Sequence, residues 1–242
     1  MIPLADQVAV VTGAGSGIGK ALALALGAQG ADLALVGRHG GPLDAVAQEA
    51  RAAGAEARTY PTDLTRPHEI RDLGAALERD FGRVDVVIHS AAVAMLGAVA
   101  DAAAEDFDTH YRTNLLGPYL LSQCLLPMLR KRRGQIVFIN SSAGLIARAN
   151  VGQYAATKHA LKAIADSLRE EVNCDGVRVL SVFAGRTATP MQQRLLASEG
   201  RPFLPDRLLQ PEDIASAVIN SLCLAPTAEV TEIKIRPMMK FE

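Results

Sequence analysis

Short runs of apolar residues alternate along the chain with longer stretches rich in alanine and leucine. The apolar runs predict buried strands at residues 7–12, 32–36, 56–60, 84–88, 135–139, 177–182 and 232–235. The longer stretches predict helices at residues 17–29, 43–53, 67–81, 104–131 and 151–173 and from residue 211, with Pro118 and Pro127 as candidate kinks. Strict alternation of strand and helix predicts an α/β fold: a doubly wound Rossmann fold, with a parallel seven-stranded sheet and helices on both faces. We expect residues 1–242 to form a single domain.

Composition narrows the classes of partner. The formal net charge is −1, which gives no electrostatic case for binding nucleic acid or a membrane. The basic run at 130–133 is interpreted as a solvated helix end. No segment reaches about 18 uninterrupted apolar residues, and the first residues lack a signal-peptide pattern. The histidines show no metal-ligand spacing, and three distant cysteines indicate free thiols in a reducing compartment, so we expect a cytoplasmic protein without a metal.

A glycine-rich turn follows the first predicted strand. Residues 12–19 read Thr-Gly-Ala-Gly-Ser-Gly-Ile-Gly, which fits TGxxxGxG and not GxGxxG. Glycines at this place permit a tight turn and let a diphosphate approach backbone N–H groups at a helix N-terminus. The turn therefore predicts nucleotide binding, the alternative being an ordinary glycine-rich connection between strand and helix.

The second and third predicted strands supply the features that distinguish one cofactor from another. Arg38 follows the second strand where many dinucleotide folds place an acid, and an arginine suits a 2′-phosphate. We therefore predict NADP(H) over NAD(H), unless Arg38 is only a solvated loop residue. Asp63, after the third strand, either accepts a hydrogen bond from the adenine amino group or caps the following helix.

Tyr154 and Lys158 lie four residues apart on a predicted helix, so they share one face of it. A nearby fixed cation favours phenolate over phenol, and we expect it to lower the tyrosine pKa from about 10. Such a tyrosine can give or take a proton at a substrate oxygen. Taken alone, the pair could equally be a surface contact on one helix.

Together with Asn114 and Ser141, these motifs appear in an order that resembles the short-chain dehydrogenase/reductase family, in its single-domain form. The resemblance extends from about residue 7 to residue 235. It implies that Tyr154 is the general acid and base, that Lys158 holds the nicotinamide ribose, and that Ser141 orients the substrate oxygen. It also implies that Asn114 holds a water linking Lys158 to solvent; the alternative is a helix residue bonded to nearby backbone.

The resemblance also implies a cofactor site and an assembly. The implied cofactor-binding residues are Gly13, Ser16, Gly17, Ile18, Gly19, Arg38, Asp63, Leu64, Ala91, Tyr154, Lys158, Gly185, Thr187 and Thr189. The implied substrate is a small carbonyl or alcohol compound. Members of the family pair through helices equivalent to 104–131 and 151–173, which implies a homodimer or homotetramer.

The chain departs from the family pattern at two turns. His89-Ser90-Ala91-Ala92 replaces the usual Asn-Asn-Ala-Gly, and we interpret His89 as a structural rather than a catalytic residue. Ala184-Gly185 replaces the usual Pro-Gly. The segment at about 190–210 is expected to cover the substrate, and its arginines, Arg194, Arg201 and Arg207, either face water, which we favour, or bind an anionic tail of the substrate.

Two other functions share this fold. One is a regulatory protein that binds NADPH without turnover, and the presence of Asn114, Ser141, Tyr154 and Lys158 together argues against it. The other is an epimerase or dehydratase that uses bound cofactor transiently, and such chains usually carry a larger C-terminal substrate region.

Overall fold

The computed structural model of the protein describes residues 4–239. Within this range one parallel sheet has the strand order β3-β2-β1-β4-β5-β6-β7. Its strands are β1 (Val8–Thr12), β2 (Asp32–Gly37), β3 (Ala57–Pro61), β4 (Val86–His89), β5 (Gln135–Ser141), β6 (Arg178–Ala184) and β7 (Glu232–Ile235). The helices are α1 (Gly17–Ala28), α2 (Gly40–Ala52), α3 (Pro67–Phe81), α4 (Ala104–Tyr111), α5 (Gly117–Arg132), α6 (Gly152–Val172), α7 (Pro190–Ser198) and α8 (Pro211–Leu222). This arrangement confirms the doubly wound fold.

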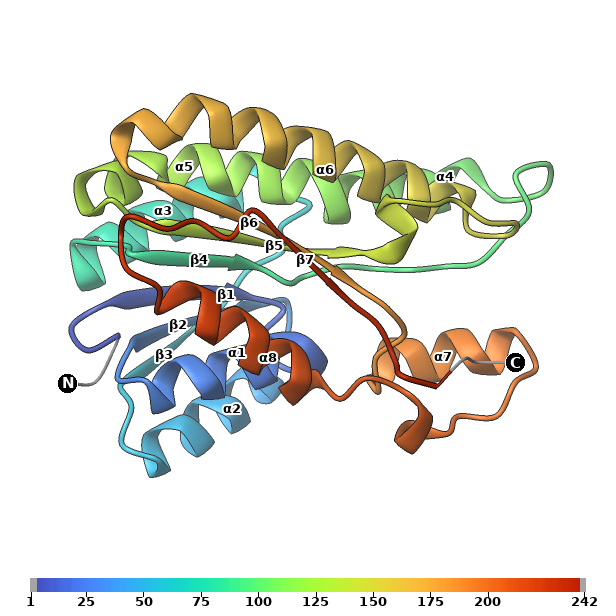
Figure 1. Ribbon diagram of the computed structural model, residues 1–242, viewed down its shortest axis with the longest axis horizontal. Coiled ribbons are helices and arrows are strands. Elements are labelled where there is room, and N and C mark those ends of the chain that lie inside the picture. The colour runs from blue at the N-terminus through green and yellow to red at the C-terminus, as the bar shows by residue number, and fades with distance from the viewer. Residues whose placement is uncertain (1–3, 240–242) are drawn as a thin grey trace.

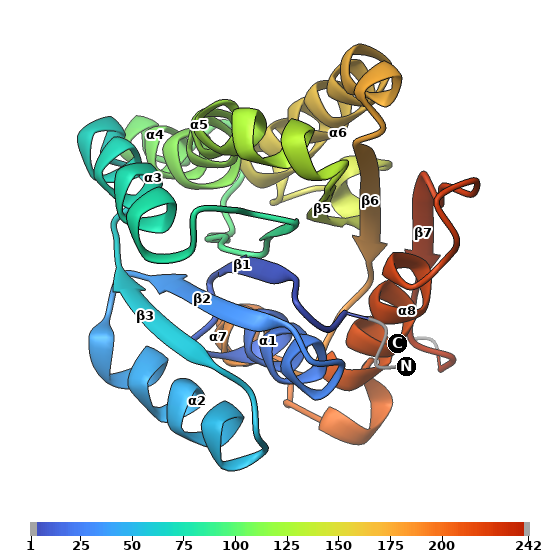
Figure 2. The same ribbon diagram turned by 90° about the vertical axis from the view of Figure 1, so that its left-hand side faces the viewer.

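Alternate residues of each central strand face opposite sides of the sheet, so the core has two layers. Ala9 and Val11 of β1 pack in the layer that contains α1, α2 and α8. Val10, between them, packs in the layer that contains α3, α5 and α6. Figures 1 and 2 show these two groups of helices on opposite faces of the sheet. Because both faces of the strands are covered, near-continuous apolar strand sequences are expected, as observed.

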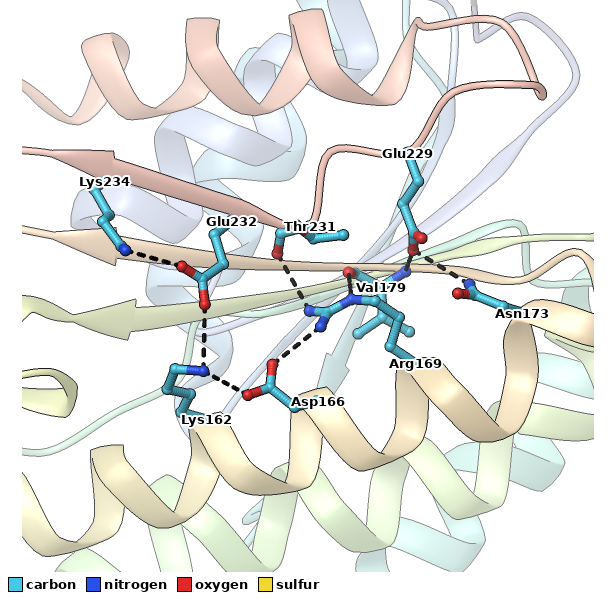
Figure 3. Close-up of polar contacts among 9 residues, drawn as sticks. All are labelled: Lys162, Asp166, Arg169, Asn173, Val179, Glu229, Thr231, Glu232 and Lys234. Atoms are coloured by element: carbon cyan, nitrogen blue, oxygen red, sulfur yellow. Dashed lines mark hydrogen bonds and ion pairs between the residues drawn. The ribbon is translucent and has the colours of Figure 1, made fainter.

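The edge strand β7 is held by side chains as well as by strand pairing (Figure 3). β7 pairs with β6 only from Ser181 to Ala184. Before that point, Arg169 on α6 donates to the Val179 carbonyl at 2.9 Å and to the Thr231 carbonyl at 3.2 Å. Glu229 accepts from the Val179 amide at 2.8 Å. These side chains satisfy buried backbone groups of β6 that have no strand partner there.

The predicted helix at 104–131 differs from expectation in its middle. A π-helical turn, Arg112–Leu116, separates α4 from α5. Pro118 follows it in the first turn of α5, and Pro127 lies inside that helix. Because proline has no N–H, Pro118 cannot donate to the carbonyl four residues earlier, which belongs to Asn114. The regular α-helical hydrogen bonding is therefore interrupted next to a predicted site residue.

A smaller difference concerns the start of the second helix, which begins at Gly40 instead of residue 43.

No helix within residues 4–239 combines the length and the apolar character needed to cross a bilayer. Cys124, Cys174 and Cys223 are free thiols.

A buried carboxylate lies beneath the amino ends of the strands. Asp85 is 6% exposed and accepts hydrogen bonds from the Val8 amide at 2.9 Å and from Arg132 at 3.0 Å. Arg83 donates to both of its carboxylate oxygens at 2.8 Å. Burial raises the pKa of Asp85, but the hydrogen bonds from Arg83, Val8 and Arg132 outweigh it and hold the pKa below its ordinary value. The carboxylate thus ties β1 to the loop before β4 and to the end of α5.

Asp85→Asn should lower the free energy of unfolding by about 2 kcal/mol at pH 7, because the amide cannot satisfy both arginines. The contribution of Asp85 is present above its unfolded-state pKa of about 3.9 and is lost as the pH falls through its lowered folded-state pKa. The difference from wild type should therefore shrink in acid. Urea unfolding of wild type and Asp85→Asn at pH 7 and at about pH 3.5 measures the loss of stability and its decrease in acid.

Asp175→Asn is the matched control, because Asp175 pairs with Arg130 of the same basic run but is exposed. It should cost less than about 1 kcal/mol. Equal losses in the two variants would contradict the structural role of Asp85.

Candidate active site

A cavity of about 850 Å³ opens at the carboxyl ends of the strands. The loops after β1, β2, β3, β4, β5 and β6 all contribute to its lining. Parallel strands bring these loops to one edge of the sheet, where α/β folds bind ligands. All of the predicted catalytic and cofactor-binding residues line this cavity, except Asn114.

The glycine turn forms a close-fitting cradle at the start of α1. Gly13 and Gly17 have positive φ values of 67° and 52°, which disfavour other residues. A Cβ on Gly19 would lie 2.3 Å from the Gly13 carbonyl oxygen, so the backbone can approach only because glycine stands there. Ser16 makes no side-chain cap, and the first turn of α1 contains no acid. The N-terminal N–H groups of α1 therefore suit the diphosphate of a dinucleotide.

Arg38 and Asp63 stand on neighbouring loops of the same cavity. Arg38 is exposed, and its charge helps lower the pKa of Asp63. Asp63 accepts hydrogen bonds from the Thr65 amide at 3.0 Å and from the Thr65 hydroxyl at 2.8 Å. The residue before α3 is Arg66, which makes no side-chain cap. Asp63 therefore closes a local turn and does not cap the helix, contrary to one of the two expectations.

Tyr154, Lys158 and Ser141 meet at the inner part of the cavity. Tyr154 and Ser141 share a side-chain hydrogen bond. The Lys158 ammonium nitrogen lies 5.8 Å from the centroid of the Tyr154 ring and donates to the Ile139 carbonyl at 3.0 Å. Lys158 is 2% exposed. This arrangement places a hydroxyl pair and a buried cation together at one wall, as acid–base chemistry at a substrate oxygen requires.

The pKa of Tyr154 is raised, opposite to the expected direction. The protein around its hydroxyl removes it from water and so raises the pKa, while the hydrogen bond with Ser141 acts in the opposite sense. Burial also lowers the pKa of Lys158 to about 8. The lysine is thus still largely protonated at neutral pH, and the tyrosine is a phenol. The expectation failed because it considered the nearby cation and left out the desolvation of the tyrosine hydroxyl, which is the largest cause of its shift.

Asn114 is 1% exposed and uses its side chain to bind backbone. Its Oδ1 accepts from the Val93 amide at 2.8 Å, and its Nδ2 donates to the Val93 carbonyl at 2.9 Å and to the Thr157 hydroxyl at 3.3 Å. The structure therefore favours the alternative role named above, a residue bonded to nearby backbone. The side chain braces the loop after β4 and does not reach into the cavity.

His89 has the structural character expected of it. It is 2% exposed, stacks on Phe138 with ring centroids 4.8 Å apart, and shares a hydrogen bond of 2.8 Å with Ser122. Burial lowers the pKa of His89 to about 3, so the ring stays neutral. A neutral imidazole beneath the cavity braces β4 against β5 and α5.

The loop after β6 packs against the glycine cradle. The side chain of Thr189, which caps α7, lies within 3.0 Å of the Cβ position of Gly17. Gly185 lies so close to Arg236 that a Cβ would approach the Arg236 Cα to 3.1 Å. Thr187 is 4% exposed and donates to the Gly185 carbonyl at 3.0 Å. These contacts fix the predicted cofactor-binding threonines in place.

The segment after this loop contains α7 and a single 3-10 turn, Pro205–Arg207. Of its three arginines, Arg194 lines the cavity, whereas Arg201 and Arg207 do not. Arg148, from the loop after β5, lines the cavity as well.

A model of the family described as short chain dehydrogenase matches residues 7–200. The chain belongs to the short-chain dehydrogenase family. It is 35% identical over 239 residues to an uncharacterized oxidoreductase of Staphylococcus epidermidis, with 98% of this chain and 100% of the relative covered. The resemblance seen in the sequence is thereby confirmed, and the protein is an oxidoreductase of this family.

Two solved structures show the same fold with different cofactors. An alcohol dehydrogenase from the archaeon Thermococcus sibiricus, complexed with 5-hydroxy-NADP, matches with a TM-score of 0.89 and 28% identity over 98% of both chains. A short chain dehydrogenase from Mycobacterium paratuberculosis, bound to NAD, matches with a TM-score of 0.87 and 26% identity over 96% of this chain and 97% of the other. The fold that this short-chain dehydrogenase shares with them is thus found both with a 5-hydroxy-NADP complex and with bound NAD.

Sequence reasoning assigned no side-chain role to two polar residues that hold this short-chain dehydrogenase's site together. The Thr12 hydroxyl accepts from the amides of Ser90 and Ala91 at 3.0 and 3.1 Å, and so joins the turn after β1 to the turn after β4. Asn140 donates to the Lys158 carbonyl at 3.0 Å and accepts from the Ser141 amide at 2.8 Å. The sequence signal that could have pointed to both roles is a polar residue near the end of an apolar strand.

Gly19→Ala should weaken the binding of NADPH and NADH by about tenfold or more, because the methyl group would collide with the Gly13 carbonyl and displace the cradle. Fluorescence titration of each cofactor measures the dissociation constant. Gly41→Ala is the control, because a methyl group added at this helical glycine would meet no other part of the protein within 4 Å, and it should bind both cofactors normally. Unchanged affinity in Gly19→Ala would show that the cradle does not hold the cofactor.

Proposed function

We propose that this short-chain dehydrogenase interconverts a carbonyl compound and an alcohol with NADP(H), using Tyr154 as general acid and base. The observation that carries the proposal is the hydrogen-bonded pair of Tyr154 and Ser141 beside the buried Lys158, within the cavity that the glycine cradle opens into. A bound nicotinamide cofactor supplies the hydride for the carbonyl carbon. The residues of the chain position the substrate and move the proton.

Charge develops on the substrate oxygen as the carbonyl is reduced. Ser141 and Tyr154, which already share a hydrogen bond, donate towards that oxygen, and Tyr154 transfers its proton. Because the pKa of Tyr154 is raised, it is present as a phenol across the neutral range and is ready to donate. A tyrosine held as a phenol is in the protonation state that the reduction of a carbonyl requires.

Lys158 and Asn114 have supporting roles in this proposal. Lys158 would hold the ribose hydroxyls of the cofactor and keep a positive charge beside Tyr154. The Asn114 side chain is already hydrogen-bonded to the Val93 backbone, so a water that returns protons to Lys158 would bind the backbone carbonyl of Asn114 instead. Pro118 leaves this carbonyl without its normal α-helical donor, which makes it available for such a water.

The same cavity supports the other assignments at the cofactor site. Gly13, Ser16, Gly17, Ile18 and Gly19 would hold the diphosphate. Arg38 is exposed at the cavity, where it would bind a 2′-phosphate, so NADP(H) is proposed over NAD(H). Asp63, Leu64 and Ala91 would contact the adenosine, and Gly185, Thr187 and Thr189 the nicotinamide end. The segment 190–210 would cover the substrate.

Assembly and localisation stay predictions. Exposed aromatic residues on one stretch of α4 and α5 support pairing of two chains through these helices: Phe107, Tyr111 and Tyr119 are 46%, 43% and 38% exposed. We propose a homodimer or homotetramer. A cytoplasmic location rests only on the free thiols.

Tyr154→Phe should lower kcat by at least about a hundredfold with little change in NADPH affinity, because it removes the proton donor and keeps the ring. NADPH oxidation over a panel of aldehydes, ketones, quinones and sugars provides the measurement. A regulatory NADPH-binding protein would instead bind the cofactor tightly and turn over no carbonyl. An epimerase or dehydratase would convert its substrate without net consumption of NADPH.

Arg38→Asp should shift the preference from NADPH towards NADH by about tenfold or more, because the carboxylate repels a 2′-phosphate and accepts from a ribose hydroxyl. The ratio of kcat/KM for the two cofactors reports the change. Arg71→Asp, a charge reversal at an exposed residue of α3 outside the cavity lining, controls for the overall charge. An unchanged ratio in Arg38→Asp would contradict the assignment.

A further inference from the structure

The loop after β4 is tied down at alternate residues. The Val93 amide donates to Asn114, the Met95 amide donates to His110 Nε2 at 3.0 Å, and the Gly97 amide donates to the Asn150 carbonyl at 2.9 Å. Donors at every second residue are typical of an extended segment. Val93, Ala94 and Leu96 of this loop line the cavity. The three bonds therefore set the position of one cavity wall.

Two of these acceptors belong to one helical stretch. His110 lies at the end of α4, and Asn114 follows it four residues later in the π-helical turn. Two residues of an extended segment span roughly 6.6 Å, close to the roughly 5.4 Å of one helical turn. Side chains one turn apart can therefore bind alternate amides of the loop. His110 and Asn114 form a pair of supports for it.

His110 also contacts the proposed catalytic tyrosine. Its ring meets the Tyr154 ring edge to face, with centroids 6.0 Å apart, and its side chain is enclosed, with the residue 1% exposed. The same imidazole thus touches Tyr154 on one side and holds Met95 on the other. Such contact geometry limits the freedom of the Tyr154 ring relative to the cavity wall.

Accepting from the Met95 amide fixes the tautomer of His110. Nε2 must be unprotonated, so the proton of the neutral ring lies on Nδ1. Nδ1 is buried without a close hydrogen-bond partner among the described residues; the Asp106 carbonyl, one turn earlier, attracts it only weakly. A second proton would occupy Nε2, convert the acceptor into a donor, and set it against the Met95 N–H.

We propose that His110 is a positioning residue whose neutral imidazole locks the loop at 93–97 against Tyr154, and that its protonation in acid releases this lock. The inference rests on the proposed role of Tyr154 for its effect on turnover, but its effect on the loop stands independently. Nothing in the glycine cradle or the Arg38 loop takes part, so the lock should govern the substrate side of the cavity.

The surroundings of His110 set the direction of its titration. Burial lowers the pKa of His110, with a smaller opposing effect from the carbonyl and charge of Asp106. Tyr154 faces it from α6 as a neutral phenol, with the Lys158 cation one turn further along, and residues 93–97 carry no titratable side chain. The imidazole is therefore neutral at pH 7 and becomes charged only below its ordinary pKa of about 6.5. Because the unfolded chain protonates first, stability should also fall as the pH drops below that value.

Three substitutions separate positioning from simple packing. His110→Gln places an oxygen where Nε2 lies and cannot titrate, so it should keep kcat/KM within about threefold of wild type. His110→Leu removes the acceptor and should lower kcat/KM by about tenfold, because the part-buried Met95 N–H loses its partner. His159→Gln, at an exposed histidine of α6, is the control and should change nothing. NADPH affinity should stay the same in all three.

The pH profile and hydrogen exchange give the decisive readouts. Wild-type kcat/KM, measured with the best carbonyl compound of the panel, should fall in acid, and His110→Gln should lack or displace this fall. The rate of hydrogen exchange at the Met95 amide, corrected for the intrinsic effect of pH, should rise in wild type as the pH is lowered from 7 to 5. The rate should be fast at both pH values in His110→Leu. It should be slow at both pH values in His110→Gln.

The outcomes distinguish this inference from the proposed function. If no carbonyl compound is turned over but Met95 exchange behaves as described, the proposed function fails and the lock stands. Equal exchange at Met95 in wild type, His110→Gln and His110→Leu would overturn the lock, whatever the turnover. An acid fall in kcat/KM that is unchanged in His110→Gln would overturn the role of His110 in the pH dependence. The wild-type exchange profile needs no variant, so poor folding of a variant leaves the inference testable.

Discussion

The site depends on how partly buried backbone groups are satisfied where the parallel strands end. Beyond its last residue a strand loses its sheet partners, yet the amides and carbonyls that follow lie partly out of water and need hydrogen bonds. Here side chains provide them: Thr12 binds the amides after β4, Asn140 joins β5 to α6, and Asn114 and His110 hold the loop beside them. The groups that complete the backbone thereby build the walls of the cavity.

Burial has a second effect, because it sets the charge of the groups in the wall. His89 and His110 are neutral, Tyr154 is a phenol, and Lys158 stays charged with a lowered pKa. With the buried Lys158 cation beside it, the Tyr154 phenol is in the form that can donate a proton. The glycine cradle, in contrast, provides backbone dipoles and no charged side chain, which suits an anionic diphosphate.

Much of this arrangement could be predicted from the sequence. The alternation of strands and helices predicted the fold. The spacing of the motifs identified Tyr154, Lys158, Ser141 and the glycines, which the structure places around one cavity. Prediction failed at the direction of the Tyr154 pKa shift, because desolvation depends on neighbours from every side. It also failed to find His110, since a histidine inside a helical stretch gives no sign of which amide it will meet.

The sequence by itself determined the order of elements, the glycine positions and the identity of the reactive side chains, because strand periodicity, turn conformation and chemistry are local properties. Only the tertiary structure decided that Asn114 braces Val93 with its side chain, that the helix at 104–131 contains a π-helical turn, and that His110 touches both Met95 and Tyr154. The contacts of Asn114 and His110 join residues from different segments of the chain, and packing selects them from many partners that the sequence would equally allow.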